Sequence, residues 1–179
     1  VTKKDFFSNK RKFDIVFITN PIHLHMSYAL KFAEQGSHLF IEKPLSNNLR
    51  NLSKLKNIVK KNKIKVCCGY QFRFHPGISL IKNIIKKNRL GRVIGSTFYF
   101  GEYLPSMHKY EDYKKTHMAK FNQGGGAVLS LSHQVDLVHY LFGTPKQILK
   151  VNSKNSNLKI NVDDNRDIAQ NNGVIWNTA

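Results

Sequence analysis

The sequence lacks most of the features that mark secreted, membrane-spanning or zinc-binding proteins. Its 179 residues include only two cysteines, Cys67 and Cys68, and these are adjacent. Neighbouring cysteines form no unstrained disulfide and have no zinc-site spacing, so we expect a reducing, cytoplasmic setting in which both are small core residues. No run of 18 apolar residues occurs, which argues against a membrane-spanning helix. The first residues hold no apolar segment typical of a signal peptide, and because Val1 is not a methionine we expect a longer parent sequence.

Acidic residues are also scarce, at 11 against 29 lysines and arginines, and the formal net charge is +18. A basic balance of this size favours contact with nucleic acid or a membrane surface. The lysines are nevertheless dispersed among asparagines. The two densest stretches, residues 54–65 and 82–92, have a helical pattern without interleaved aromatic side chains. We therefore interpret the charge as solvated helix faces and keep nucleic-acid binding as the weaker alternative.

A third absence concerns nucleotide binding. The pattern G-x-G-x-x-G, whose backbone cradles the pyrophosphate of a dinucleotide, occurs nowhere in the chain. Gly124, Gly125 and Gly126 are consecutive, and no strand pattern closely precedes them. The sequence therefore does not contain the phosphate-binding turn of a dinucleotide fold.

The first 70 residues do contain an alternation of apolar runs and helical patterns. The runs are rich in β-branched and aromatic residues, and the segments between them repeat apolar residues every three or four positions. We expect buried strands at 13–19, 38–44 and 64–70, a helix at 23–35 that ends at Gly36, and a helix from a cap at Ser46 to about residue 63. Strand, helix and strand with short joins predict a right-handed βαβ unit and half of a doubly wound parallel sheet.

The pattern changes after Tyr70. We expect helices at 78–88 and 127–142, strands at 93–100 and 147–153, and an irregular loop at 102–120. Periodicity decays from residue 155 onward. The change of pattern predicts two domains, residues 1–70 and 71–179.

The second apolar run ends in Glu42, Lys43 and Pro44. In open α/β sheets, ligands bind beyond the carboxyl ends of the strands, which is where this run places its acid and its base. Pro44 restricts Lys43 to an extended backbone, and a lysine that is desolvated at a strand end can act as acid or base. The alternative is an ordinary solvated charge pair.

The helix predicted after the glycines carries Ser130, His133 and Asp136 at three-residue spacing, which places them on one face. A histidine between small polar groups can transfer protons, and the alternative is a hydrogen-bonded structural histidine. His23 and His25 resemble a metal pair, but on a helix they diverge by about 200°. No third ligand is in register with them, so we expect no metal site.

Four motifs in this order resemble the Gfo/Idh/MocA family, the relatives of glucose–fructose oxidoreductase and inositol dehydrogenase. They are Thr19-Asn20-Pro21 with His25, Glu42-Lys43-Pro44, the run YQFRFHP from Tyr70 to Pro76, and Gly124-Gly125-Gly126 with His133 and Asp136. The resemblance covers about residues 10–150. The run SHQVD, which ends at Asp136, resembles a subgroup associated with sugar and surface-polysaccharide metabolism.

The resemblance implies an α/β fold in which an incomplete doubly wound, Rossmann-like parallel sheet is followed by a partial α/β domain with a mostly antiparallel sheet. It implies an oxidoreductase that uses NAD or NADP to move a hydride at a hydroxyl or carbonyl carbon of a sugar, a polyol or a sugar derivative. It also implies a homo-oligomer for the complete protein. Because a hydroxyl loses its proton as hydride leaves its carbon, a base must lie beside the cofactor ring.

By the same resemblance, Lys43 would be the acid/base at the reacting hydroxyl and His133 would support proton transfer. Asp136 would help to place His133 or the substrate. The nicotinamide-ribose end of the cofactor would be lined by Asn20, Pro21, His25 and Glu42, with Arg73 near the cofactor or the substrate.

The sequence departs from the family pattern at two points. The family often has an aspartate where this chain has Ser130, and a serine carries no charge. The glycine-rich first βα unit is also missing, so we expect the chain alone to have little dehydrogenase activity. We also expect the sheet of the second domain to be short of strands and to expose its edges. Both departures favour the alternative of a non-catalytic binding or scaffold protein that keeps the fold.

Overall fold

The computed structural model describes residues 12–145, 148–170 and 174–178. The chain divides into two compact units, Val1–Gly69 and Tyr70–Ala179. Within the described residues, no helix is both long and apolar enough to cross a bilayer.

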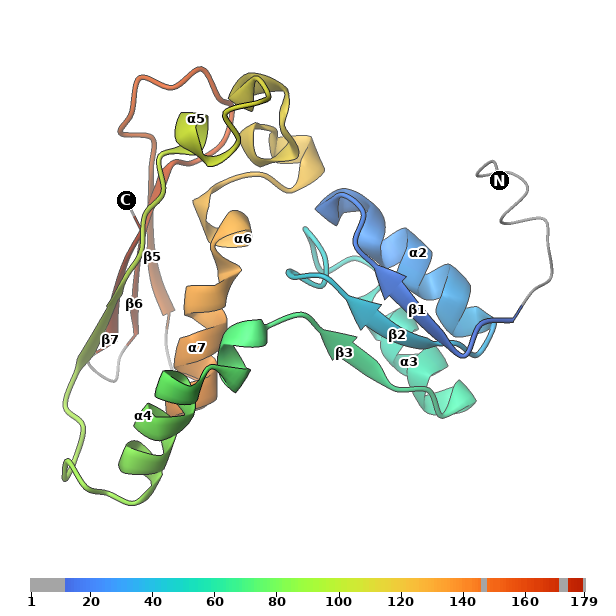
Figure 1. Cartoon of the computed structure of the whole chain (residues 1–179), viewed down its shortest axis with the longest axis horizontal. Helices are drawn as coiled ribbons and strands as arrows, with labels where there is room; N and C mark the ends of the chain where they lie inside the picture. The colour runs from blue at the N-terminus through green and yellow to red at the C-terminus, as the bar shows by residue number, and fades with distance from the viewer. Residues whose placement is uncertain (1–11, 146–147, 171–173, 179) are drawn as a thin grey trace. The chain divides into compact units, whose positions relative to one another are not determined.

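The first unit is a three-stranded parallel sheet with two helices (Figure 1). Its elements are β1 (Ile15–Ile18), α2 (Ile22–Glu34), β2 (His38–Ile41), α3 (Leu52–Asn62) and β3 (Val66–Cys68). The strand order is β1-β2-β3, with Ile18 level with Ile41 and Ile41 level with Cys68. The predicted Rossmann-like parallel sheet is confirmed, and each strand is shorter than its apolar run suggested.

The two helices begin in different ways. Helix α2 follows Pro21, whose carbonyl accepts the first helical bond from Leu24 at 2.8 Å, and it ends before Gly36, which has a φ of 81°. Helix α3 begins at Leu52 behind Asn51, so the predicted cap at Ser46 is wrong. The asparagine side chains explain the delay, because Asn48 Oδ1 accepts the Arg50 amide at 2.8 Å and holds the segment in turns.

The core of the first unit lies on one face of its sheet. Buried residues of α2 and α3, among them Phe32 and Leu55, pack against Ile18 and Ile41. The alternate positions of β1 point away from both helices, and Phe17 is 67% exposed there, with its ring 5.3 Å from that of Phe40.

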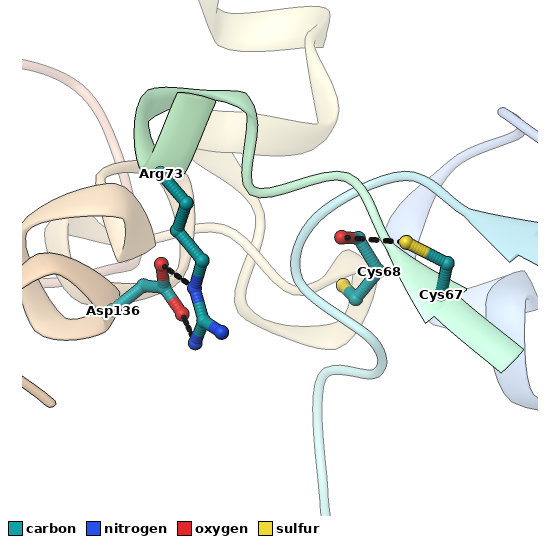
Figure 2. Close-up of polar contacts among 4 residues, drawn as sticks. All are labelled: Cys67, Cys68, Arg73 and Asp136. Carbon is teal, nitrogen blue, oxygen red and sulfur yellow. Dashed lines mark hydrogen bonds and ion pairs between the residues drawn. The ribbon is translucent and has the colours of Figure 1, made fainter. Parts of the chain in front are cut away.

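This one-sided burial corrects two expectations. The run at 13–19 was expected to form a buried strand, yet only its alternate residues are covered by helices among the described residues. The cysteines were expected in the core, yet Cys67 is exposed and Cys68 is half-buried. The Cys67 thiol donates to its neighbour's carbonyl at 3.7 Å (Figure 2). Both outcomes follow from the period of two along a strand, because residues on the uncovered face meet solvent.

The second unit combines helices with a four-stranded sheet. Its first elements are the 3₁₀ helix η1 (Gln71–Phe74), α4 (Pro76–Lys86), β4 (Ser96–Tyr99) and α5 (Leu104–Met107). Three 3₁₀ turns, η2 (Tyr113–Lys115), η3 (His117–Ala119) and η4 (Phe121–Gln123), precede α6 (Ala127–Ser130) and α7 (Ser132–Phe142). The last strands are β5 (Ile148–Ser153), β6 (Asn165–Gln170) and β7 (Val174–Thr178).

The sheet of the second unit has the order β4-β7-β6-β5, with antiparallel pairs except between β4 and β7 (Figure 1). This confirms the mostly antiparallel sheet that the resemblance implied. Helix α7 packs on β4 through Val138, which is fully buried, and through the Phe98 and Phe142 rings, whose centroids are 6.3 Å apart.

The single helix predicted over 127–142 is two helices. Leu131 has φ −103° and ψ 31°, which ends α6, and its carbonyl accepts from the Gln134 amide at 3.3 Å in the first turn of α7. Ser130 therefore does not share a continuous helix face with His133, and that part of the spacing argument is wrong. His133 and Asp136 both lie on α7, so their shared face holds.

The core assignment of the first unit predicts a large difference between two phenylalanines. Phe32→Ala should cost about 3–5 kcal/mol of unfolding free energy because it empties a site that is 3% exposed. Phe17→Ala should cost at most about 1.5 kcal/mol, since mainly its ring pairing is lost. Urea denaturation followed by circular dichroism measures both changes, and equal losses would contradict the one-sided core.

Candidate functional site

The carboxyl ends of the three parallel strands form one edge of the first unit. The Glu42 amide donates to the Ile18 carbonyl at 2.8 Å, and the Gly69 amide donates to the Ile41 carbonyl at 2.8 Å. Asn20 and Lys43 follow the strands at this same edge. The structure thus brings together the residues that follow β1, β2 and β3.

His25 connects two of these strand ends. Its side chain is 1% exposed on α2, with Nε2 2.7 Å from the Asn20 carbonyl oxygen and Nδ1 2.9 Å from the Pro44 carbonyl oxygen. Both ring nitrogens therefore contact backbone, and the imidazole holds the loop after β1 to the loop after β2. The predicted contact of His25 with a cofactor stays a prediction.

This edge offers a hydrogen-bond acceptor and open space to a ligand. Asn20 Oδ1 is buried and has no hydrogen-bond partner among the described residues, so it is available to accept from a ligand. A Cβ built on Gly69 would lie 3.1 Å from Glu42 Oε2, so glycine leaves room beside this carboxylate. Lys43 is half-buried, and its peptide bond to Pro44 is cis.

In the second unit, Arg73 and Asp136 form a two-pronged pair (Figure 2). Arg73 Nε donates to Asp136 Oδ2 at 2.8 Å, and Nη2 donates to Oδ1 at 2.5 Å. The Asp136 side chain is 7% exposed and that of Arg73 is 37% exposed. The hydrogen bonds to Asp136 outweigh the effect of burial and raise the pKa of the Arg73 guanidinium. The pair fixes η1 against α7.

Aromatic rings surround this pair. The Arg73 guanidinium lies 5.2 Å from the Tyr140 ring centroid and 5.9 Å from that of Tyr70. The Lys82 ammonium lies 3.2 Å from the same Tyr140 ring. Because rings attract cations at their faces, these contacts stabilise the cationic groups that meet between η1, α4 and α7.

His133 lies in an aromatic environment on α7. It is 9% exposed, with its ring centroid 4.5 Å from that of Phe72 and 5.8 Å from the edge-on Tyr70 ring. Asp136 lies one helical turn after His133, and its carboxylate oxygens accept hydrogen bonds from Arg73. The roles of His133 in proton transfer, of Asp136 in placing it and of Arg73 at a cofactor or substrate stay predictions.

The second unit also contains a cavity of about 510 Å³. Its wall is formed by the end of β4, the loop that leads into α5, helix α6 and the segment at 155–164. Most of this wall is apolar, from Tyr103, Leu104, Met107 and Leu158 among others. The polar side chains are Glu102, Ser130, Asn155, Ser156, Asp163 and Asp164. A concave, mostly apolar site with a few polar groups is the usual form of a small-molecule site.

Two of these carboxylates are held in place. Asp163 Oδ2 accepts the Ala127 amide at 3.2 Å, at the start of α6. Asp164 accepts from the Asn155 amide at 2.7 Å, the Ser156 amide at 3.1 Å and the Ser156 hydroxyl. Partial burial raises the pKa of the Asp164 carboxyl, but these hydrogen bonds outweigh it and the net pKa lies below its ordinary value.

The consecutive glycines serve this part of the fold by close packing. A Cβ on Gly125 would lie 2.3 Å from the Met118 carbonyl oxygen, and one on Gly126 would lie 2.8 Å from Asp163 Oδ1. The Gly126 amide donates to the same Met118 carbonyl at 3.1 Å. These residues therefore bring η3 against the start of α6.

Sequence reasoning missed the Arg73–Asp136 pair and the acidic side chains of the cavity. The pair joins residues 63 positions apart, which no local pattern reveals. Asp163 and Asp164 are adjacent acidic residues in a basic chain, but no role was predicted for them. Among the described residues, no group of three or more histidines, cysteines or acids is arranged to hold a metal ion.

Two family models match the chain. The model described as an oxidoreductase family with an NAD-binding Rossmann fold matches residues 2–70. The model described as the GFO/IDH/MocA C-terminal domain matches residues 78–169, about half of the chain.

Curated relatives include two sugar dehydrogenases. Levoglucosan dehydrogenase of Pseudarthrobacter phenanthrenivorans is 28% identical over 131 residues, which covers 72% of this chain and 33% of that protein. Glucose-6-phosphate 3-dehydrogenase of Bacillus subtilis is 24% identical over 149 residues, which covers 83% of this chain and 42% of that protein.

Solved structures share the fold. The WlbA dehydrogenase of Bordetella pertussis, in complex with NADH and UDP-GlcNAcA, matches with a TM-score of 0.80 at 19% identity, over 99% of this chain and 51% of that chain. A levoglucosan dehydrogenase in complex with NADH and levoglucosan matches with a TM-score of 0.79 at 23% identity, over 98% and 49%. At these identities the likeness establishes the fold alone. The chain spans about half the length of these solved structures and less of the curated relatives.

The two-pronged pair predicts that Arg73→Lys destabilises the second unit. Lysine cannot make both bonds, so Asp136 loses a partner while buried, and the loss should be about 1–3 kcal/mol of unfolding free energy. Chemical denaturation monitored by tyrosine fluorescence measures the change. Arg92→Lys, at an exposed arginine of the same unit, should change stability by less than about 0.5 kcal/mol. Equal effects of the two variants would contradict the role of the pair.

The lowered pKa of Asp164 predicts a pH-dependent contribution to stability. Because the folded pKa lies below that of the unfolded chain, about 3.9, the contribution is present above that value and is lost as pH falls through the folded pKa. Asp164→Asn should therefore lower the Tm at neutral pH, and its difference from wild type should shrink as pH falls below the unfolded value. Calorimetry at neutral and at acidic pH tests this, with exposed Glu111→Gln as the control. A difference that persists in acid would contradict it.

Proposed function

The chain belongs to the GFO/IDH/MocA oxidoreductase family, and we propose that its two units carry the hydride-transfer end of an NAD(P)-dependent oxidoreductase of sugars, polyols or sugar derivatives. The observation that carries this proposal is the edge of the first sheet. There Asn20, Glu42 and Lys43 follow parallel strands that end level with one another. In sheets of this kind, ligands bind at that edge.

The residues at this edge have distinct proposed tasks. Asn20 Oδ1 accepts a hydrogen bond from the cofactor, since no described residue satisfies it. Glu42 accepts from ribose hydroxyls beside Gly69, whose missing side chain leaves the space. Pro21 immediately precedes α2, and His25 keeps the Asn20 and Pro44 loops at a fixed separation. When bound, the nicotinamide ring supplies the hydride acceptor or donor.

Lys43 is the proposed acid/base. This half-buried residue follows the central strand, and its amino group is suited to exchange a proton with the hydroxyl whose carbon is oxidised. His133 supports this transfer in the proposal, and Asp136 acts by fixing Arg73 and η1 beside His133. The substrate is a sugar, a polyol or a derivative, in line with the named substrates of the relatives.

The 179-residue chain should itself be a weak catalyst. Its sequence holds no G-x-G-x-x-G turn, the pattern that provides the amide cradle for a pyrophosphate. The cofactor's affinity should then come mainly from the nicotinamide end. A non-catalytic role is the second candidate, and Ser130 favours it because a serine replaces an acid that the family often has.

Titration with NADH and with reduced nicotinamide mononucleotide tests the proposal. Both should bind with similar dissociation constants of about 1 mM, because only the shared end finds partners. Asn20→Ala should weaken both by about fivefold, the value of one lost hydrogen bond. Micromolar binding of NADH alone would contradict the missing cradle, and no binding of either would contradict the proposed function.

Lys43→Ala separates catalysis from binding. It should leave the nicotinamide affinity within about twofold while it lowers sugar-dependent turnover by about 10²–10⁴-fold, the usual contribution of a general acid or base. Exposed Lys60→Ala on α3 serves as the matched control. Turnover that is measurable and equal in the two variants would remove Lys43 from its role and favour another base.

A further inference from the structure

The cavity of the second unit has a charge opposite to that of the protein. From this we infer that its ligand is an uncharged sugar or an amino sugar, and not a phosphorylated, uronic or nucleotide-linked one. The inference rests on the proposed function for the class of ligand, and it adds the sign of the charge that the site accepts.

The charged residues that line the cavity are acidic, whereas the charged residues of the whole chain are mostly basic. Basic residues outnumber acidic ones by 29 to 11 in the sequence. Yet the charged residues that line the cavity are Glu102, Asp163 and Asp164, with no lysine, arginine or histidine among the lining residues that the structure describes. Charged residues drawn evenly from this chain would be mostly basic, so the acidic lining is a property of this site.

The carboxylates are positioned before any ligand arrives. Asp164 is held by three hydrogen bonds from Asn155 and Ser156, and Asp163 is held by the Ala127 amide. A carboxylate offers about four acceptor positions, so Asp164, which accepts three hydrogen bonds, keeps capacity for a further donor. Hydroxyl and ammonium groups supply such donors, whereas a phosphate or a second carboxylate would meet like charge.

The apolar part of the wall suits the ring of a sugar. Tyr99 and Tyr103 line the cavity and are 68% and 67% exposed, so parts of both aromatic side chains are open to a ligand. Carbon–hydrogen faces of a pyranose can lie on such surfaces while the hydroxyls reach the carboxylates. The volume of about 510 Å³ lies within the range of about 300–1,000 Å³ usual for small-molecule sites.

Ser130 links this cavity to the family motif. It lies on α6, in the wall of the cavity, at the position where the family often has an aspartate. With serine there, the neighbouring wall still presents Asp163 and Asp164, which come from the segment before β6. The site therefore keeps its acidic character although the helix does not supply it.

The methionines of the chain provide a direct test. There are three: Met107 and Met118 line the cavity, and Met26 is buried in the core of the first unit. The chain labelled with ¹³C-methyl methionine is titrated with glucose, glucosamine, glucuronate and glucose 6-phosphate near pH 6.5. Glucose and glucosamine should shift the Met107 and Met118 signals but not that of Met26. The two anionic sugars should bind at least about tenfold more weakly.

Three results would overturn the inference. They are equal shifts from glucuronate or glucose 6-phosphate, no shift from glucose or glucosamine at about 100 mM, which is far above a millimolar constant, and shifts that include Met26 to the same extent.

A charge reversal in the cavity lining sharpens the test. Glu102 is exposed and lines the cavity, so Glu102→Lys should leave the fold intact. It should strengthen binding of glucose 6-phosphate by about tenfold and weaken that of glucosamine, with glucose within about twofold. Glu111→Lys, at an exposed glutamate outside the lining, makes the same change in net charge and should alter none of these affinities. Equal effects of the two reversals would show a net-charge effect and overturn the inference.

The outcome is separable from the test of the proposed function. Nicotinamide binding is tested with the Asn20→Ala variant in the first unit, whereas sugar selectivity is measured from the methyl signals of Met107 and Met118 in the second. Selective methyl shifts without nicotinamide binding would keep the cavity assignment and reject hydride transfer. Nicotinamide binding with no sugar selectivity would keep the proposed function and reject the cavity assignment.

Discussion

The register of three short parallel strands is the constraint on which the candidate site depends. Parallel strands that end level with one another deliver the residues after each strand to one edge. Here Asn20, Lys43 and Gly69 reach that edge from three separate segments. A shift of one residue in the pairing of β2 would turn its apolar side chains to the opposite face and move Glu42 and Lys43 with them. Packing of Leu39 and Ile41 against α2 therefore fixes the position of the charged residues.

Much of this arrangement could be predicted from the sequence. Each apolar run in the first 70 residues became a strand, and α2 lies within one residue of its predicted bounds because Pro21 and Gly36 mark both ends. The family motifs led to the correct family. These successes share a cause, since they depend on local periodicity and on residues whose backbone preferences are strong.

The failures depend on partners that are distant in sequence. Nothing local indicates that Leu131 interrupts a helix in an apolar segment, or that β7 pairs with β4. Exposure of Phe17 could not be inferred either, because an apolar strand reads the same whether one face or both are covered. The acidic residues of the cavity are evident in the sequence, but only the folded chain places them in the same cavity lining as Ser130.

The close approach at Gly125 has a consequence for inheritance. A base change in the first or second position of a glycine codon yields either a stop or a residue with a Cβ, and a Cβ there would lie 2.3 Å from a backbone oxygen. Backbone cannot turn aside as the end of a flexible side chain can. Every amino-acid replacement at Gly125 therefore introduces this backbone contact, and no conservative replacement exists.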